Sequence, residues 1–164
     1  MWRYFIFPVL LALPTIAGPR VRVVVGPSAP PVERHAAELL VRELQTLFDA
    51  DARVDDAPGS PEKTGTPADT STAVILVGTP RSNPAIPADT VGKLSTQGHV
   101  LKSSPRGLLV AGGSPAATFW AAAEFGYHFG IRHLLSGDLP PAEKPAPRLD
   151  GIDLVLEKIV RAHV

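Results

Sequence analysis

Residues 106–138 read RGLLVAGGSPAATFWAAAEFGYHFGIRHLLSGD, and this stretch decides the fold of the chain. Its first apolar run, residues 107–111, is typical of a buried strand, and a pair of glycines follows it. Ser114-Pro115 is a typical helix start, with serine as the N-cap and proline at the first helical position. Gly130 is expected to end that helix in the left-handed conformation. The stretch therefore predicts a strand, a glycine turn, a helix and a further extended segment.

Apolar patterns upstream predict the remaining strands and one long helix. Three runs have the composition of strands: residues 21–25, 52–55 and 72–78. Between the first two, apolar side chains recur every three or four residues over 32–48, which predicts an amphipathic helix that Pro30-Pro31 opens. We expect the acidic side chains of this helix to lie on its solvent side: Glu33, Glu38 and Glu43.

The order of these elements indicates the fold class. Residues 98–102 and 107–111 are apolar runs separated by a four-residue polar segment, which predicts a β-hairpin. Residues 88–94 are expected to form one or two helical turns, and residues 131–135 an extended segment. Because strands and helices alternate only once before the hairpin, the pattern favours a mixed sheet over a purely parallel one. The predicted class is α+β, an α/β sandwich with two main helices packed on a mixed β-sheet.

The composition allows one domain with a real core and excludes several classes of site. Apolar residues make up 45% of the chain, and 16 basic side chains balance 16 acidic ones. A net charge of zero gives no electrostatic footprint for nucleic acid, so no nucleic-acid partner is expected. The absence of cysteine excludes disulfides, thiolate metal sites and cysteine nucleophiles.

The first residues have the composition of a targeting segment. Residues 1–18 hold one charge, Arg3, ahead of an apolar run that two prolines interrupt. Thr15-Ile16-Ala17 resembles a signal cleavage pattern. We therefore expect a signal peptide over residues 1–18, a secreted or periplasmic protein, and no transmembrane segment after cleavage.

The last residues have linker composition. Residues 140–164 begin with a proline-rich, charged segment that is expected to lead away from the rest of the fold. Within this tail, residues 152–160 are apolar enough for one strand or a short helix. The domain itself is accordingly expected at residues 19–139.

The glycine turn in the central stretch has two interpretations. Backbone amides of Gly112, Gly113 and Ser114 at a helix start are able to cradle a phosphate. However, the sequence has neither the GxGxxG nor the GxxxxGK[ST] spacing of nucleotide-binding loops. We interpret Gly112 and Gly113, like Gly130 and Gly137, as structural turns.

No catalytic or metal-binding constellation is recognisable in the sequence. The histidines lack the HExxH spacing, no pair of carboxylates stands out for glycoside hydrolysis, and there is no GxSxG motif. We therefore expect no catalytic residue, no metal site and no cofactor in this chain. Trp120 and Tyr127 each combine an aromatic ring with a polar group, so they are the candidate sugar contacts.

The central stretch resembles the N-terminal accessory domain of α-glucuronidases and bacterial β-N-acetylhexosaminidases. The matching features are the glycine turn at 112–113, the aromatic and alanine pattern of 119–123, the strand at 130–132 and the Gly137-Asp138 turn. Upstream, PSAPPVERHAAELLVREL looks like the first helix of that domain, and AVILVGTP looks like its central strand and loop. The resemblance thus covers residues 21–139.

This resemblance implies a hexosaminidase-like α+β domain that precedes a catalytic (β/α)₈ barrel and supports it without supplying catalytic carboxylates. Only 25 residues follow Leu139, whereas a barrel needs about 250. The leading hypothesis is a secreted accessory domain of polysaccharide degradation, as a fragment or a stand-alone copy, whose partner is a barrel in cis or in trans. Two alternatives stay open: a free-standing carbohydrate-binding module that uses Trp120 or Tyr127, and a small phosphate- or nucleotide-binding protein that uses residues 112–114.

Overall fold

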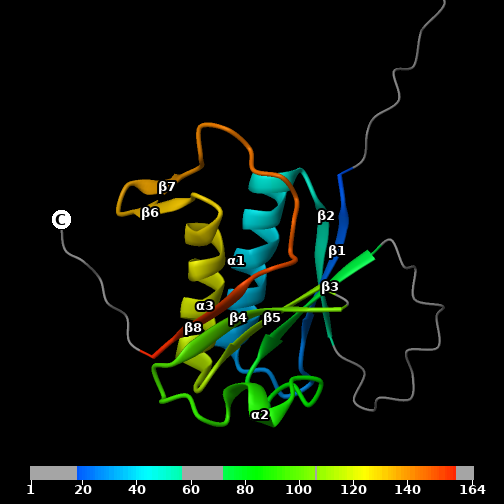
Figure 1. The fold of residues 1–164 in the computed structure, drawn as a ribbon, viewed down its shortest axis with the longest axis vertical. Helices are drawn as coiled ribbons and strands as arrows, with labels where there is room; N and C mark the ends of the chain where they lie inside the picture. The colour runs from blue at the N-terminus through cyan, green and yellow to red at the C-terminus, as the bar shows by residue number, and fades with distance from the viewer. Residues whose placement is uncertain (1–17, 57–71, 106, 158–164) are drawn as a thin grey trace, which may run out of the picture.

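The computed structural model describes residues 18–56, 72–105 and 107–157. In these residues the chain forms a six-stranded sheet, a separate two-stranded hairpin and three helices (Figure 1). The predicted signal peptide up to residue 17 and residues 57–71 lie outside the described residues.

The main sheet is mixed, as the sequence predicted, with the strand order β2-β1-β3-β5-β4-β8. The neighbours β2, β1, β3 and β5 run parallel, whereas β4 lies antiparallel between β5 and β8. The strands are β1 (Arg20–Val25), β2 (Asp51–Asp56), β3 (Thr72–Gly78), β4 (His99–Ser104), β5 (Gly107–Gly112) and β8 (Asp153–Leu156).

Two helices, α1 (Pro31–Phe48) and α3 (Pro115–His128), lie side by side on one face of this sheet (Figure 1). Alternate strand residues point at them, because successive side chains of a strand face opposite sides. The fully buried side chains of this layer are Val23, Val25, Leu40, Leu44, Leu47, Ile75, Val77, Leu101, Leu108 and Phe125. The predicted α+β class with two main helices on a mixed sheet is therefore confirmed.

The opposite face of the sheet carries a smaller apolar cluster. The one-turn helix α2 (Ala88–Val91) and the loop before it contribute Val91 and Ile86. These side chains pack on Val100 of β4 and Leu109 of β5. The prediction of a short helix over 88–94 is confirmed for its first half.

Helix α3 begins and ends as its sequence predicts. The Ser114 hydroxyl accepts a hydrogen bond from the Ala117 amide at 3.2 Å, and Pro115 occupies the first helical position. Gly130 has a φ of +97°, and the next amide, that of Ile131, donates to the Gly126 carbonyl at 2.8 Å. This backbone reversal closes the helix in a conformation that glycine adopts at little cost.

Helix α3 buries one of its faces and exposes its last two residues. Thr118, Ala121, Ala122 and Phe125 are fully buried, whereas Tyr127 is 54% exposed. The alanines keep this helix close to α1, and the single large ring at Phe125 fills the space between the layers.

The C-terminal segment returns to the sheet instead of leading away from it. Strand β8 pairs with β4, with Leu154 opposite Leu101. Before the strand, the Ser103 hydroxyl donates to the Leu149 carbonyl at 2.5 Å and accepts from the Ile152 amide at 2.8 Å. Without β8, strand β4 would present an open edge of the sheet, and β8 covers it.

A second difference concerns the segment after α3. In place of one extended run, the chain forms a small antiparallel hairpin of β6 (Arg132–Leu134) and β7 (Gly137–Leu139). Gly137 has a φ of +127° at the turn, which agrees with its predicted role. The hairpin projects beside the last turn of α3, away from the main sheet (Figure 1).

Candidate functional site

Ligands of open α/β sheets usually bind at the carboxyl ends of the parallel strands. Strand β1 has β2 on one side and β3 on the other. The chain leaves β1 through α1 to β2 and later returns on the opposite side, so the connections diverge between β1 and β3. Crevices at such points are the usual ligand sites of open α/β sheets.

The chain itself fills this crevice. The Asn83 amide nitrogen donates to the Val24 carbonyl of β1 and to the Val77 carbonyl of β3, both at 3.1 Å. Asn83 is fully buried, and a side chain at Gly26 would collide with the Ser82 carbonyl, only 1.8 Å from the position of its Cβ. The loop after β3 therefore occupies the position of a ligand.

The glycine turn before α3 is likewise occupied by protein groups. The Gly113 amide donates to the Gly98 carbonyl at 2.9 Å, and the Ser114 hydroxyl donates to the Thr96 carbonyl at 2.6 Å. A Cβ at Gly113 would lie 2.0 Å from the Ser95 carbonyl oxygen, and a Cβ at Gly112 would lie 2.4 Å from a backbone nitrogen of α3. These contacts support the interpretation of both glycines as close-packed turns over that of a phosphate loop.

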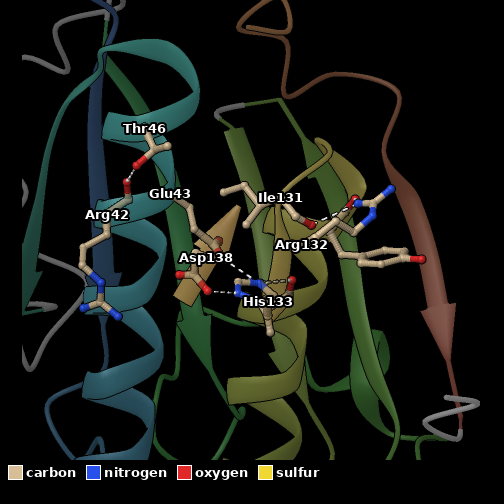
Figure 2. Close-up of polar contacts among 9 residues, drawn as sticks. Arg42, Glu43, Thr46, Ile131, Arg132, His133 and Asp138 are labelled. Atoms are coloured by element: carbon tan, nitrogen blue, oxygen red, sulfur yellow. Dashed lines mark hydrogen bonds and ion pairs between the residues drawn. The ribbon is translucent and has the colours of Figure 1, made fainter. Parts of the chain in front are cut away.

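A cluster of titratable side chains lies where α1, α3 and the β6–β7 hairpin meet. Glu43 extends from α1 toward His133 of β6 and Asp138 of β7, whereas the Arg42 guanidinium points away from them (Figure 2). The imidazole Nδ1 lies 2.8 Å from Asp138 Oδ1, and Nε2 lies 3.4 Å from Glu43 Oε1. One imidazole therefore stands between two carboxylates.

Alternation along the hairpin explains this arrangement. His133 and Asp138 are directly opposite each other in the β6–β7 register, so both side chains leave the hairpin on its inner side. The imidazole Nε2 is also 3.3 Å from the Ala123 carbonyl of α3. The Asp138 carboxylate and the Ala123 carbonyl are acceptors for imidazole protons.

Glu43 is buried although it is ionisable. Its side chain is only 2% exposed, and neither carboxylate oxygen has a hydrogen-bond partner in the described part of the chain. Burial raises the pKa of Glu43 to about 9, the negative charge of Asp138 adds to the rise, and the positive charge of Arg42 offsets part of it. The carboxyl group is thus held in its protonated form at neutral pH.

Gly126 of α3 makes room for this carboxyl group. A Cβ at this position would lie 2.3 Å from Glu43 Oε1. Gly126 is interior to the helix, where glycine costs up to about 1 kcal/mol relative to alanine. Glycine therefore stands at the position where Glu43 enters the interface between α1 and α3, despite its lower helix propensity.

A cavity of about 180 Å³ opens beside the cluster. It is lined by Arg42, Glu43, Thr46, Ile131, Asp138 and Pro140. The Glu43 oxygens themselves are shielded from water, although the cavity is open to solvent on one side.

A second buried glutamate occupies the other end of α1. Glu33 is fully buried next to Gly78, and its oxygens have no hydrogen-bond partner within the described ranges. Burial raises the pKa of Glu33, and the neighbouring Ser82 and Thr79 partly offset the rise. The expectation that Glu33 and Glu43 are surface charges is therefore wrong, whereas Glu38 is exposed as expected.

The helical period of α1 carried a signal for both residues. Glu33 falls three and seven positions before the buried Ala36 and Leu40, and Glu43 falls three after Leu40 and four before Leu47. Each therefore shares the apolar face of the helix. Because both side chains are acidic, the sequence analysis assigned them to the solvent side. No local pattern pointed to His133 as the neighbour of Glu43.

The two predicted sugar contacts lie apart on α3. Trp120 is half-buried and Tyr127 is exposed, and seven residues separate them by roughly 10 Å along the helix. The Arg132 guanidinium lies 4.2 Å from the centre of the Tyr127 ring, so one face of that ring is already covered. The structure does not bring the two rings together.

Two further properties concern metals and membranes. Across residues 18–56, 72–105 and 107–157, no three histidine, aspartate or glutamate side chains are grouped so as to hold a metal ion. In the part of the chain that the structure describes, no helix is both long and apolar enough to cross a membrane.

Comparison with known proteins leaves the family open. No family model and no curated protein matches the sequence. Eleven chains of solved structures match, and among them is a family GH115 4-O-methyl-α-glucuronidase with specificity for decorated arabinogalactans. Its match has 26% sequence identity and a TM-score of 0.46, and it covers 66% of this chain and 13% of that enzyme. This chain therefore spans a small part of that enzyme's length.

Proposed function

We propose that this chain is a non-catalytic accessory domain of a glycoside hydrolase, and that it supports a catalytic (β/α)₈ barrel in the same polypeptide or in trans. The proposal includes the α-glucuronidase or β-hexosaminidase type, a role in polysaccharide breakdown and a secreted or periplasmic location. It assigns no catalytic residue to this chain.

The observation that carries the proposal is the placement of the motifs that resemble the accessory domain. The strand, the glycine turn, the alanine-rich helix and the two motifs that follow occupy β5, the turn at 112–113, α3, β6 and β7 in that order. The motifs quoted from the first helix and central strand likewise fall on α1 and β3. The resemblance therefore corresponds to consecutive elements of one fold.

Two features of the surface agree with a domain that docks on a catalytic barrel. The crevice at the carboxyl ends of β1 and β3 is filled by Asn83 and its loop, so the usual ligand position of an α/β sheet is closed. The hairpin exposes large apolar side chains: Leu134 and Leu139 are 54% and 56% exposed, and Leu135 at the turn is fully exposed. Neighbouring exposed apolar side chains of this kind are typical of surfaces that dock on another domain.

The proposal is tested with a barrel encoded in the same gene or beside it. Expressing that barrel alone and together with this chain should show a lower melting temperature and lower soluble yield for the barrel alone. Addition of this chain should restore both. A barrel with the same stability and activity in either preparation would refute the proposal, whereas a locus without any barrel would refute the version in which this chain is a fragment of a longer glycosidase.

A sugar titration separates the carbohydrate-binding alternative. Xylan and chitin oligosaccharides are titrated into this chain while tryptophan fluorescence is read. An accessory domain without a sugar site gives no saturable change. Saturable binding that is lost in Trp120→Ala or Tyr127→Ala would instead identify a carbohydrate-binding module.

A further inference from the structure

We propose that Glu43, His133 and Asp138 form a proton-dependent latch that fastens the β6–β7 hairpin to the α1–α3 pair and releases it as the pH rises. The inference concerns the conformation of the hairpin and does not rest on the proposed function. Figure 2 shows the three side chains converging from α1, β6 and β7.

Where the β6–β7 hairpin meets α1 and α3, we expect the hairpin to be the element that moves. Its strands have three residues each, and every residue from Arg132 to Leu139 is exposed, so it has no apolar core of its own. Isolated two-stranded hairpins are marginal in water. By contrast, α1 and α3 share fully buried side chains such as Leu40, Leu44 and Phe125. The inner face of the hairpin is held through His133.

The contacts of His133 and Glu43 depend on a proton between them. With Glu43 neutral, its hydroxyl is able to donate to Nε2; with the imidazole doubly protonated, Nε2–H faces the Glu43 and Ala123 oxygens while Nδ1–H donates to Asp138. When that shared proton is lost, a buried carboxylate faces a neutral ring without a donor. Such an unpaired buried charge is strongly disfavoured.

The groups around Glu43 compensate its negative charge only in part. We therefore expect the ionised carboxylate to become hydrated through release of the hairpin. Arg42 on α1 and the Gly126 backbone of α3 favour the ionised form, Asp138 on β7 repels it, and α3 also presents the Ala123 carbonyl. The cavity of about 180 Å³ beside the cluster is bordered by Asp138 and Pro140. Movement of the hairpin would therefore admit water to Glu43 and separate the two negative charges.

The direction of the pH effect follows from linkage. The pKa of Glu43 rises from 4.5 to about 9 in the folded chain, so the folded state binds this proton more tightly than an opened state does. The contribution of the latch is fully present below pH 4.5 and is lost as the pH rises to about 9. Within this window each pH unit is expected to raise the opening equilibrium of the hairpin by up to about tenfold.

The test is amide hydrogen exchange of the full chain between pH 6 and pH 9, corrected for the intrinsic exchange rate. In the wild type, protection of residues 132–139 should fall by up to about tenfold per pH unit, while the amides of β1 and β3 stay protected. Glu43→Gln keeps a neutral side chain at every pH and should abolish this dependence. Glu38→Gln, an exposed glutamate on the same helix, serves as the matched control and should behave as the wild type does.

Several outcomes would overturn the latch. These are hairpin protection that does not change with pH, a Glu43→Gln variant that keeps the wild-type dependence, and a loss of protection in β1 and β3 that parallels the loss in the hairpin. If Glu43→Gln fails to fold, titration of ¹³C-labelled glutamate carboxyl groups in the wild type decides the question. A Glu43 midpoint near 4.5, the ordinary value, contradicts the proposal, and a midpoint that coincides with the loss of hairpin protection supports it.

Discussion

At the scale of single residues, Glu43 and Gly126 depend on each other. The carboxyl group enters the interface between the two main helices, and the missing side chain of Gly126 provides the space for it. Apolar side chains such as Leu40, Leu44 and Phe125 pack elsewhere in the core that the two helices share. The pair therefore marks a position where the sequence departs from the best local choice for helix stability.

This dependence predicts a coupled effect of two substitutions. Gly126→Ala places a Cβ 2.3 Å from Glu43 Oε1, so it should lower the free energy of unfolding by about 1–3 kcal/mol despite the better helix propensity of alanine. In a Glu43→Ala background the space is free, and the same substitution should be neutral or stabilising. Urea unfolding of the four variants gives the coupling energy. Equal costs of Gly126→Ala in both backgrounds would contradict the packing described here.

Residue-scale chemistry was also the part of the molecule that the sequence predicted least well. The roles of Ser114, Pro115 and Gly130 were predictable because capping depends on a few neighbouring residues. The burial of Glu43 was not predicted, because glutamate side chains are rarely buried, even at positions on the apolar face of a helix. Its contact with His133 joins residues ninety positions apart, and nothing local in the sequence specifies such a pair.

At the scale of elements, β8 is attached to β4 through a single hydroxyl as well as through the strand pairing. Ser103 bonds to both Leu149 and Ile152, so it fixes the entry of the C-terminal segment into the sheet. Apolar contacts of Ile152 and Leu154 with the core complete the attachment.

Loss of this hydroxyl should loosen the last strand selectively. Ser103→Ala leaves a carbonyl and an amide without their partner, which costs about 1–3 kcal/mol for buried groups and less for these half-buried ones. Limited proteolysis should then cleave residues 149–156 faster, while the rest of the sheet keeps its resistance. Ser104→Ala, at the next position of β4, is the control. Equal proteolysis of both variants would show that the hydroxyl does not hold the strand.

Most elements were predictable because each has a strong local period or boundary signal. The long helix, the central strands and the β4–β5 hairpin all appear where apolar spacing placed them, although Ser103 and Ser104 belong to the strand and not to the turn. The pairing of β8 was not predictable, since a strand of four residues does not specify which edge it joins. The β6–β7 hairpin was missed because each strand has only three residues.

At the scale of the whole molecule, the fold has a filled crevice at one place and an exposed apolar hairpin at another. The crevice between β1 and β3 is filled by the loop that carries Asn83, so the sheet offers no ligand position there. The hairpin instead directs Leu134 and Leu139 away from the helices, on the face opposite His133 and Asp138. A domain built in this way is suited to contact with another domain.

The central claim is that this chain docks on a catalytic barrel, and calorimetric titration of the chain into the barrel encoded with it tests that claim most directly. Saturable binding is predicted. The double substitution Leu134→Ser and Leu139→Ser should weaken it at least tenfold, about 1.4 kcal/mol, whereas Val155→Ser on β8, the edge strand of the main sheet, should leave it unchanged. No saturable binding, or binding that the hairpin substitutions do not weaken, would contradict the account.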